Sequence, residues 1–316
     1  MKALSKQKWL DLVDDLISKE DLDVIGVKEK GPKFQFAPLG NSSELRLDYD
    51  VTILPPKKEL LPVNEELLSF DISKPFDVKS EKDTGKKVLI GVHPYDMVAI
   101  NMMDKVYLGK HLDEHYDARR RNTLIIASDI LTVPERAFCG SIGTHTVEEG
   151  YDLLITDLGD SLVVDIGTQN GRALLEMSDG VRDATDEETE AVRRIREELP
   201  SKYKREMMVD QDVWSKLLED NYDHPIWGEN ARKCLSCGSC TMVCPTCYCY
   251  DVEDEVELNL SSGKRKRTWD GCLLKEFTRV GSGEIFRESP EKRYRHRYFR
   301  KGVYIPDRYG FVACVG

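Results

Sequence analysis

Four cysteines near the C-terminal end of the printed sequence constrain its fold more than any other feature. The cysteines are Cys234, Cys237, Cys240 and Cys244, and Pro245 follows the last of them. Together they have the spacing Cx2Cx2Cx3CP. Three thiolates on one short loop can ligate three irons of a cubane only if the backbone wraps the cubane closely. Small residues such as Ser236 and Gly238 permit that approach. The motif therefore predicts a [4Fe-4S] centre.

A structural zinc site is the alternative for these thiols. Zinc sites usually pair two Cx2C units across a spacer, whereas here three cysteines lie within seven residues. A radical S-adenosylmethionine enzyme would need the spacing Cx3Cx2C, which this motif does not have. The spacing favours iron and sulfide over zinc.

The fourth cysteine of the motif predicts a second cluster. In two-cluster ferredoxins this cysteine ligates the other cluster, so we expect Cys244 to share a cluster with Cys314. The sequence closes on Cys314-Val315-Gly316, and a second copy of the motif would need its next cysteine just after Gly316. We therefore expect the natural chain to continue and to supply the remaining ligands of both clusters.

Four further cysteines remain, which is the number that one more cluster needs: Cys139, Cys247, Cys249 and Cys272. The last three are close to the motif in sequence. Cys139 lies far upstream, so domain packing would have to bring it to the others. Each of the four could instead be an ordinary buried thiol, because free Cys is among the most buried residue types. The ligand count permits a third cluster, and it equally permits four packing thiols.

Length and charge limit the remaining possibilities. A chain of 316 residues suffices for two modest domains. Its net charge of −11 argues against a protein whose whole surface binds nucleic acid. No apolar run approaches the ~20 residues that cross a bilayer, and the first residues lack the apolar core of a signal peptide. Because a reducing cytosol also favours metal over disulfides for clustered cysteines, we predict a cytoplasmic protein without membrane contact.

Residues 1–229 carry the pattern of an α/β or α+β domain. Apolar residues at helical spacing predict a helix near residues 9–17, and frequent Gly and Pro between residues 24 and 83 indicate strands and turns. Strands buried on both faces are predicted by four short apolar runs, at residues 88–92, 123–127, 153–155 and 162–164. We expect a ferredoxin-like iron-sulfur domain with an insertion to follow over residues 230–316, truncated at its C-terminal end.

Two helix boundaries can be predicted from single residues. Thr185 and Glu188 have the capping-box spacing that begins a charged helix, and Pro200 ends it. Asp96 follows a buried strand, at a position where ligand-binding loops occur, but we expect it to be a helix N-cap.

Blocks outside the cysteine motif carry a family resemblance. They are residues 54–57 (LPPK), 91–96 (GVHPYD), 119–126 (RRRNTLII), 150–160 (GYDLLITDLGD), 245–249 (PTCYC), 269–274 (WDGCLL) and 293–298 (RYRHRY). In this order, over most of the chain after about residue 50, they resemble the iron-sulfur (beta) subunit of cytosolic sulfhydrogenases and the corresponding iron-sulfur subunit of anaerobic sulfite reductase. The family often has Cys in place of Tyr95, and Cys-Phe-Cys where this chain has Ala137-Phe138-Cys139.

The resemblance implies a non-catalytic electron-transfer subunit of the 4Fe-4S dicluster type. Such a subunit lies between a flavoprotein subunit, which holds FAD and exchanges hydride with NAD(P)H, and a catalytic partner. That partner is a hydrogenase, a sulfite reductase or a heterodisulfide reductase. Clusters suit this role because they pass single electrons with little rearrangement. The competing interpretations are a zinc-ribbon protein that binds nucleic acid and a self-contained iron-sulfur oxidoreductase.

Two basic runs bear on the choice of partner. Lys264–Arg267 and Lys292–Lys301, the second interleaved with aromatic residues, could form a patch for nucleic acid. Cations packed around clusters would instead offset the negative charge of the thiolates, and they could also dock an acidic partner. We expect this second use for both runs. We expect the acidic stretch Asp251–Glu257 to be a solvated face.

Overall fold

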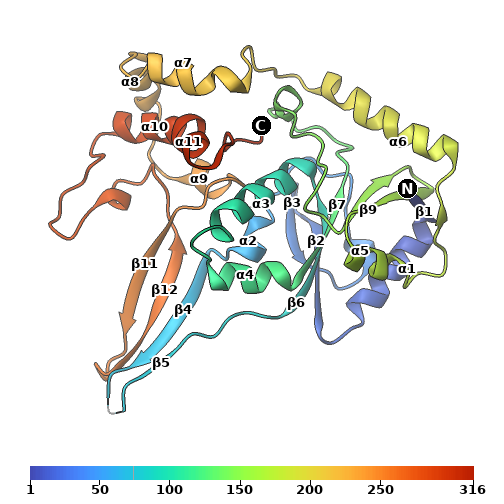
Figure 1. Ribbon diagram of the computed structural model, residues 1–316, viewed down its shortest axis with the longest axis horizontal. Coiled ribbons are helices and arrows are strands. Elements are labelled where there is room, and N and C mark those ends of the chain that lie inside the picture. Colours follow the sequence, from blue (N-terminus) through green and yellow to red (C-terminus); the bar gives the residue numbers. More distant parts are fainter. Residues whose placement is uncertain (74) are drawn as a thin grey trace.

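The protein has a mixed α/β architecture built on two sheets (Figure 1). The computed structural model describes residues 1–73 and 75–316. An eight-stranded sheet forms the body, and a four-stranded antiparallel sheet projects from it as an arm. The prediction of a mixed α/β fold is confirmed.

The large sheet has the strand order β10-β1-β9-β8-β7-β6-β2-β3. Its central strands β2, β6, β7 and β8 are parallel, and the remaining strands pair antiparallel at the two sides. The strand bounds are β1 Lys2–Ser5, β2 Leu22–Lys30, β3 Lys33–Pro38, β6 Lys86–Val92, β7 Thr123–Ser128, β8 Leu153–Asp157, β9 Ser161–Ile166 and β10 Arg182–Asp183. The four apolar runs predicted as buried strands are β6 to β9, so that prediction is confirmed.

Helices cover both faces of this sheet. Because side chains alternate along a strand, Val88 and Ile90 of β6 enter one apolar core while Leu89 enters another. The first core is completed by α1 and α5, and the second by α3 and α4. The helix bounds are α1 Lys6–Ile17, α3 Pro94–Tyr107, α4 Glu114–Arg121 and α5 Gln169–Leu175.

Two helix boundaries test the predictions made from single residues. Helix α6 (Asp186–Glu198) begins with the predicted capping box at Thr185 and ends before Pro200, where the chain continues as the 3-10 turn η3 (Leu199–Lys202). The prediction for Asp96 is wrong. Helix α3 has His93 as its N-cap and Pro94 in its first turn, so Asp96 lies inside that turn.

The arm joins strands from distant parts of the chain. It has the order β11-β12-β4-β5, with bounds β4 Asn64–Asp71, β5 Asp77–Lys79, β11 Tyr250–Val256 and β12 Ser262–Trp269. The sheet therefore combines residues from both sides of the boundary predicted between 229 and 230. Every residue of β11 is exposed, which confirms that the acidic stretch is a solvated face.

A buried ion network anchors the arm to the body. The carboxylate of Glu65 on β4 accepts hydrogen bonds from Arg119 of α4 and from Arg267 of β12, each at 2.5 Å. Arg267 also pairs with Asp113, the N-cap residue of α4. Glu65, Arg119 and Arg267 are all buried. Two cations thus share one carboxylate at the base of the arm.

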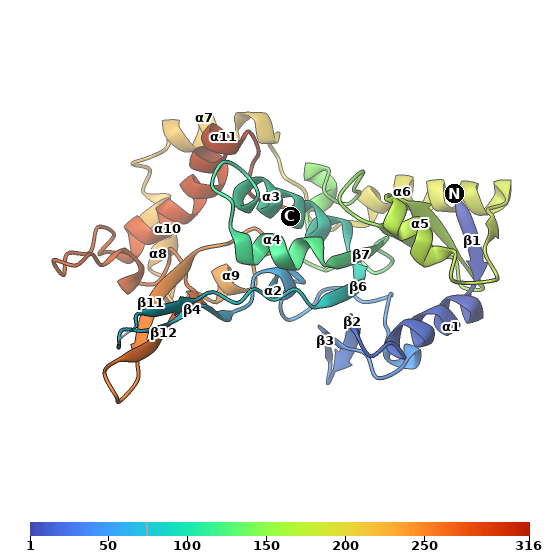
Figure 2. The ribbon, with the colours of Figure 1, turned by 60° about the horizontal axis from the view of Figure 1, so that its bottom comes forward.

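Short helices carry most of the cysteine region (Figure 2). Helices α7 (Trp214–Asp220) and α8 (Ile226–Ala231) lead into it, and α9 (Ser239–Met242) lies inside it. Helix α10 (Pro290–Phe299) continues through a π-helical turn, η6 (Arg300–Tyr304), into α11 (Ile305–Tyr309). The other short elements are η1 Ser42–Glu44, α2 Lys57–Leu60, η2 Cys139–Ile142, η4 Gln211–Val213 and η5 Glu276–Thr278. In the described residues no helix is both long and apolar enough to span a bilayer.

Candidate metal centre

Cys234, Cys237 and Cys240 lie on one tight loop that leads into α9. We call residues 234–240 the outer loop. It turns at Ser236 and Gly238, which have φ angles of 51° and 74°. A side chain at Gly238 would meet Leu274 at 3.0 Å, so the loop needs glycine there for space as well as for conformation. The thiols of Cys237 and Cys240 are exposed.

Four further cysteines form what we call the inner group, namely Cys244, Cys247, Cys249 and Cys272. The thiol of Cys247 donates a hydrogen bond to the sulfur of Cys244. This bond, together with the ammonium of Lys301 at 3.2 Å and the hydroxyl of Thr246 at 3.3 Å, holds the pKa of Cys244 well below its usual value. The polar neighbours of Cys244 therefore favour its thiolate form, which is the form that binds iron.

Cys247, Cys249 and Cys272 line one small cavity of about 20 Å³ together with Arg297 and Arg300. Cys272 is buried, and burial raises the pKa of its thiol. In residues 1–73 and 75–316, no three His, Cys, Asp or Glu side chains converge closely enough to hold a single metal ion. The structure thus brings three of the four candidates for a third cluster to one place.

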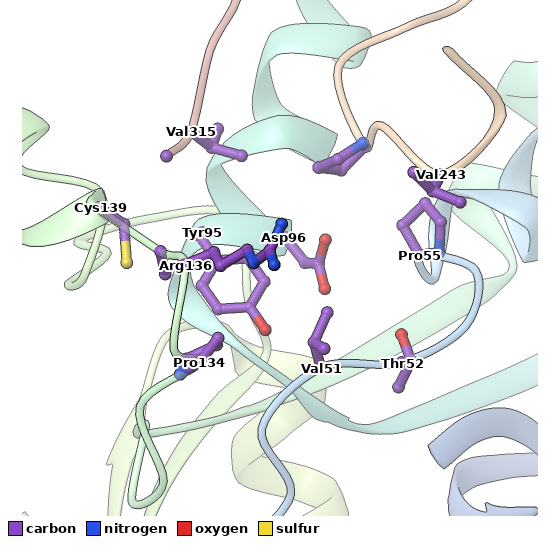
Figure 3. Close-up of a pocket in the computed structure, with 13 residues that line it drawn as sticks. Val51, Thr52, Pro55, Tyr95, Asp96, Pro134, Arg136, Cys139, Val243 and Val315 are labelled. Atoms are coloured by element: carbon purple, nitrogen blue, oxygen red, sulfur yellow. The ribbon is translucent and has the colours of Figure 1, made fainter. Parts of the chain in front are cut away.

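Cys139, the fourth candidate, is not among the residues that line this cavity. It lies in η2, where its thiol donates a hydrogen bond to the hydroxyl of Tyr203 at 2.9 Å and packs beside Leu199. It lines a separate cavity of about 310 Å³ (Figure 3). Tyr95 and Ala137, the two positions where the resembling family often has cysteine, line that same cavity. The three positions are therefore neighbours in space, although only one of them is a cysteine in this chain.

Cys314 lies close to the inner group. The carbonyl of Ala313, its neighbour in the chain, accepts hydrogen bonds from Thr246 and Lys301, both at 2.7 Å. On the other side, the carbonyl of Gly316 accepts a hydrogen bond from the backbone amide of Phe138 at 3.0 Å. The closing segment is thereby held between the inner group and η2. The sulfurs of Cys244 and Cys314 both raise the pKa of Lys301 and so favour its charged form.

Lys57 is a site residue that sequence reasoning missed. It is 2% exposed, and its ammonium donates to the carbonyls of Cys244 at 2.8 Å and Cys247 at 2.5 Å. It also lies over the ring of Trp269, 4.1 Å from the centroid. Burial lowers the pKa of Lys57 to about 8, against the opposing pull of the nearby thiols. Lys57 could have been found from the sequence, because it ends the block Leu54-Pro55-Pro56-Lys57 that carries part of the family resemblance.

Some residues of the basic run on α10 and η6 contact the cysteines, and others contact the backbone elsewhere. Arg297 donates to the sulfur of Cys247 at 3.6 Å and to the carbonyl of Cys240 at 2.9 Å. Burial disfavours the charge on Lys301, but the thiols of Cys244, Cys247 and Cys314 outweigh that effect and raise its pKa. Arg293 instead donates to backbone carbonyls, including that of Leu273 at 3.0 Å, and so supports the local fold. Part of this run faces the cysteines, as expected.

The other basic run does not lie around the cysteines, and that part of the expectation is wrong. Its four residues lie on β12, where each one pairs with a carboxylate on a neighbouring strand or on the N-cap of α4. The pairs are Lys264–Glu66, Arg265–Asp254, Lys266–Glu255 and Arg267 with Glu65 and Asp113. Antiparallel pairing with the acidic strand β11 explains the difference, because it sets opposite charges across from each other.

The cations around the inner group show whether the surroundings of these cysteines suit iron-sulfur clusters. Among the ion pairs that the structure describes, none includes Lys57, Arg297, Arg300 or Lys301. Lys57 is buried and the other three cations are partly buried, and charges shielded from water without partners are costly. The acceptors of Lys57, Arg297 and Lys301 are cysteine sulfurs, carbonyl oxygens and one hydroxyl, so thiolates that ligate iron would supply the missing negative charge. The donor set and its surroundings therefore fit [4Fe-4S] clusters.

Comparisons with known proteins agree with this geometry. A family model described as a 4Fe-4S dicluster domain matches residues 233–316. The chain is 32% identical, over 299 residues, to subunit beta of sulfhydrogenase 2 from Pyrococcus furiosus; the match covers 94% of this chain and 87% of that protein. No solved structure matches the chain. The prediction of [4Fe-4S] clusters is confirmed.

Proposed function

This chain belongs to the iron-sulfur subunit family of cytosolic sulfhydrogenases and anaerobic sulfite reductases, and we propose that it relays electrons inside an oxidoreductase complex without catalysing a reaction of its own. The observation that carries the proposal is the set of cations that faces the inner group without a carboxylate partner, with Lys57 buried and Arg297 and Lys301 partly buried. When bound, [4Fe-4S] clusters accept and release single electrons with little rearrangement.

We propose that the cysteines are divided in a ferredoxin-like arrangement. Cys234, Cys237 and Cys240 would hold one cluster on the outer loop. Cys244 and Cys314 would contribute to the second, an assignment supported by the position of Lys301 near both thiols. The protein would supply fixed donors and charges around the sulfurs, and these set how readily a cluster is reduced.

The proposal extends to the partners of the chain. The relative from Pyrococcus furiosus is named as one subunit of a sulfhydrogenase. By analogy, this chain would lie between a flavoprotein subunit that holds FAD and uses NAD(P)H, and a subunit of the hydrogenase, sulfite reductase or heterodisulfide reductase type. The pairing of every cation in the β12 run with a carboxylate leaves that run poorly suited to nucleic acid, which favours a protein partner.

Colour and iron content test the relay. Protein purified anaerobically should be brown, with broad visible absorbance that bleaches on addition of dithionite. Cys237→Ser should lower the iron content, whereas Ser282→Ala, in an exposed stretch of the same region, should leave it unchanged. Colourless protein with stoichiometric zinc would contradict the proposal. Recovery from the native host as a lone monomer with its own turnover would favour a self-contained enzyme.

We further propose that Cys247, Cys249 and Cys272 contribute to a third iron-sulfur cluster. Its support is the single cavity that these thiols share with Arg297 and Arg300. Cys139 would be a packing thiol, because it is hydrogen bonded to Tyr203. We expect Cys272→Ala to lose iron and Cys139→Ala to keep the wild-type content. If both variants contain as much iron as the wild type, the proposal of a third cluster is wrong.

A further inference from the structure

We propose that Lys57, Arg297 and Lys301 raise the reduction potential of the iron bound by the inner group, at Cys244 and at Cys247, relative to the centre on the outer loop. The inference rests on the proposed function, because it presumes that both centres hold iron. It says that the inner group and the outer loop lie in different electrostatic environments, and that residues of this chain create the difference. One of the three cations comes from a segment nearly 190 residues upstream of the cysteines that it contacts.

The three cations converge on Cys244 and Cys247 from different elements. Lys301 of η6 contacts the sulfur of Cys244 at 3.2 Å, and Arg297 of α10 contacts the sulfur of Cys247 at 3.6 Å. Lys57 at the start of α2 donates to the carbonyls of both residues. The hydroxyl of Thr246 adds a further polar contact to the sulfur of Cys244, at 3.3 Å.

These cations are held in place rather than free to move to solvent. Lys57 is fixed by its two carbonyl acceptors and by the ring of Trp269. Lys301 is fixed by the carbonyl of Ala313 at 2.7 Å and by Thr246 at 2.6 Å. Each position is maintained by neutral acceptors. Their positive charge therefore remains available to the sulfurs.

The outer loop has a different environment. The polar contacts to its sulfurs are neutral, a backbone amide at 3.4 Å from Cys234 and the hydroxyl of Ser239 at 3.3 Å from Cys237. In the part of the chain that the structure describes, no lysine or arginine is hydrogen bonded to a sulfur of this loop. Arg297 reaches it only through the carbonyl of Cys240. Water also reaches Cys237 and Cys240 and screens distant charges.

A fixed cation favours the reduced form of a nearby redox centre, because reduction adds one negative charge. The effect is large where the cation and the sulfur are both shielded from water, and small at an exposed loop. We expect Lys57 and Lys301 each to change the reduction equilibrium of the inner-group iron by roughly tenfold, which is about 59 mV for a one-electron couple. The corresponding change at the outer loop should be much smaller.

Redox titration followed by electron paramagnetic resonance tests the inference on the full-length protein, purified anaerobically. The variants are Lys57→Met and Lys301→Met, with Lys264→Met as the matched control, because Lys264 lies on the arm and pairs with Glu66. In each test variant we expect a cluster potential of the inner group to fall while that of the outer-loop centre stays close to the wild-type value, and we expect no potential to change in the control. Lys57→Arg, which keeps the charge, should restore the wild-type potential.

The iron content of each protein shows whether a negative result contradicts this inference or the proposed function. If the wild type holds iron and both test variants keep wild-type potentials, the lysines do not set the potential and the inference is wrong. It is also wrong if the potentials of the outer-loop and inner-group centres fall equally, since the two groups of cysteines would then share one environment. If the wild type itself contains no iron, the proposed function fails instead. Should one variant lose iron, the other decides the outcome, because Lys57 and Lys301 come from separate elements.

Discussion

The eight-stranded sheet and the cysteine region are stabilised by different interactions. Val88, Leu89 and Ile90 of β6 enter apolar cores on both faces of the sheet. The apolar core beside the cysteine region is much smaller, and its buried members are Trp227, Phe299 and Val303. Hydrogen bonds from cations to carbonyls and sulfurs are prominent in the rest of that region. The sheet is therefore a scaffold made by apolar burial, whereas the cysteine region relies on polar contacts that iron would complete.

Removal of iron should separate the two regions most strongly. We expect chelation under anaerobic conditions to open residues 230–249 and 270–316 while strands β6 to β9 and the arm stay folded, because metal binding contributes folding free energy only where the ligands lie. Hydrogen exchange measured by mass spectrometry would show lost protection across the cysteine region and unchanged protection in the sheet. Equal protection of both regions with and without iron would show that the comparison is wrong.

A single carboxylate should have the next largest effect, because it joins the two regions. Glu65→Gln leaves the buried guanidinium groups of Arg119 and Arg267 with a neutral partner. We expect the free energy of unfolding to fall by about 3–5 kcal/mol, the usual cost of breaking a buried pair. Urea denaturation followed by circular dichroism would measure it.

The neighbouring residue Glu66 provides the control for this substitution. Its carboxylate pairs with Lys264 on the exposed part of the arm, where both side chains are more than two-fifths accessible to water. Glu66→Gln should therefore cost about 0–1 kcal/mol. A cost for Glu65→Gln as small as that for Glu66→Gln would mean that the arm is not anchored by its ion network.

Acid should weaken each region through one histidine, and the loss over the first pH unit is the smallest effect expected here. Burial lowers the pKa of His93, beside the sheet, to about 3 and that of His296, on α10, to about 4. Unfolded histidine has a pKa near 6.5, so the unfolded chain binds the proton first as the pH falls. Stability is thus fully present above pH 6.5 and is lost between pH 6.5 and the folded-state values.

The expected slope for His93 is about 1.4 kcal/mol per pH unit within this window. The slope for His296 should be smaller, since part of its ring is exposed and water screens its surroundings. Urea midpoints measured at several pH values between 6.5 and 4.5 would give both slopes. His93→Gln should flatten the dependence more than His296→Gln, and an unchanged slope in both would contradict the assignment.

Local patterns in the sequence were sufficient for much of the scaffold. Thr185 and Glu188 identified the start of α6 because a capping box is made by residues three apart. The apolar runs identified β6 to β9 because strands buried on both faces need apolar residues on both. Asp96 was assigned wrongly, because the position of a cap depends on where the backbone leaves the extended conformation, and His93 is the residue that does so.

The type of metal centre could be predicted from the amino-acid sequence alone. The spacing of Cys234, Cys237, Cys240 and Cys244 is local, and so it limits which metal centre the loop can wrap. Which residues surround these thiols depends instead on tertiary packing. That packing brought Lys57 to Cys244, kept Cys139 beside Tyr203, and paired the β12 cations with carboxylates. The two kinds of information differ because charge and burial act through space, between residues whose separation along the chain carries no record of their contact.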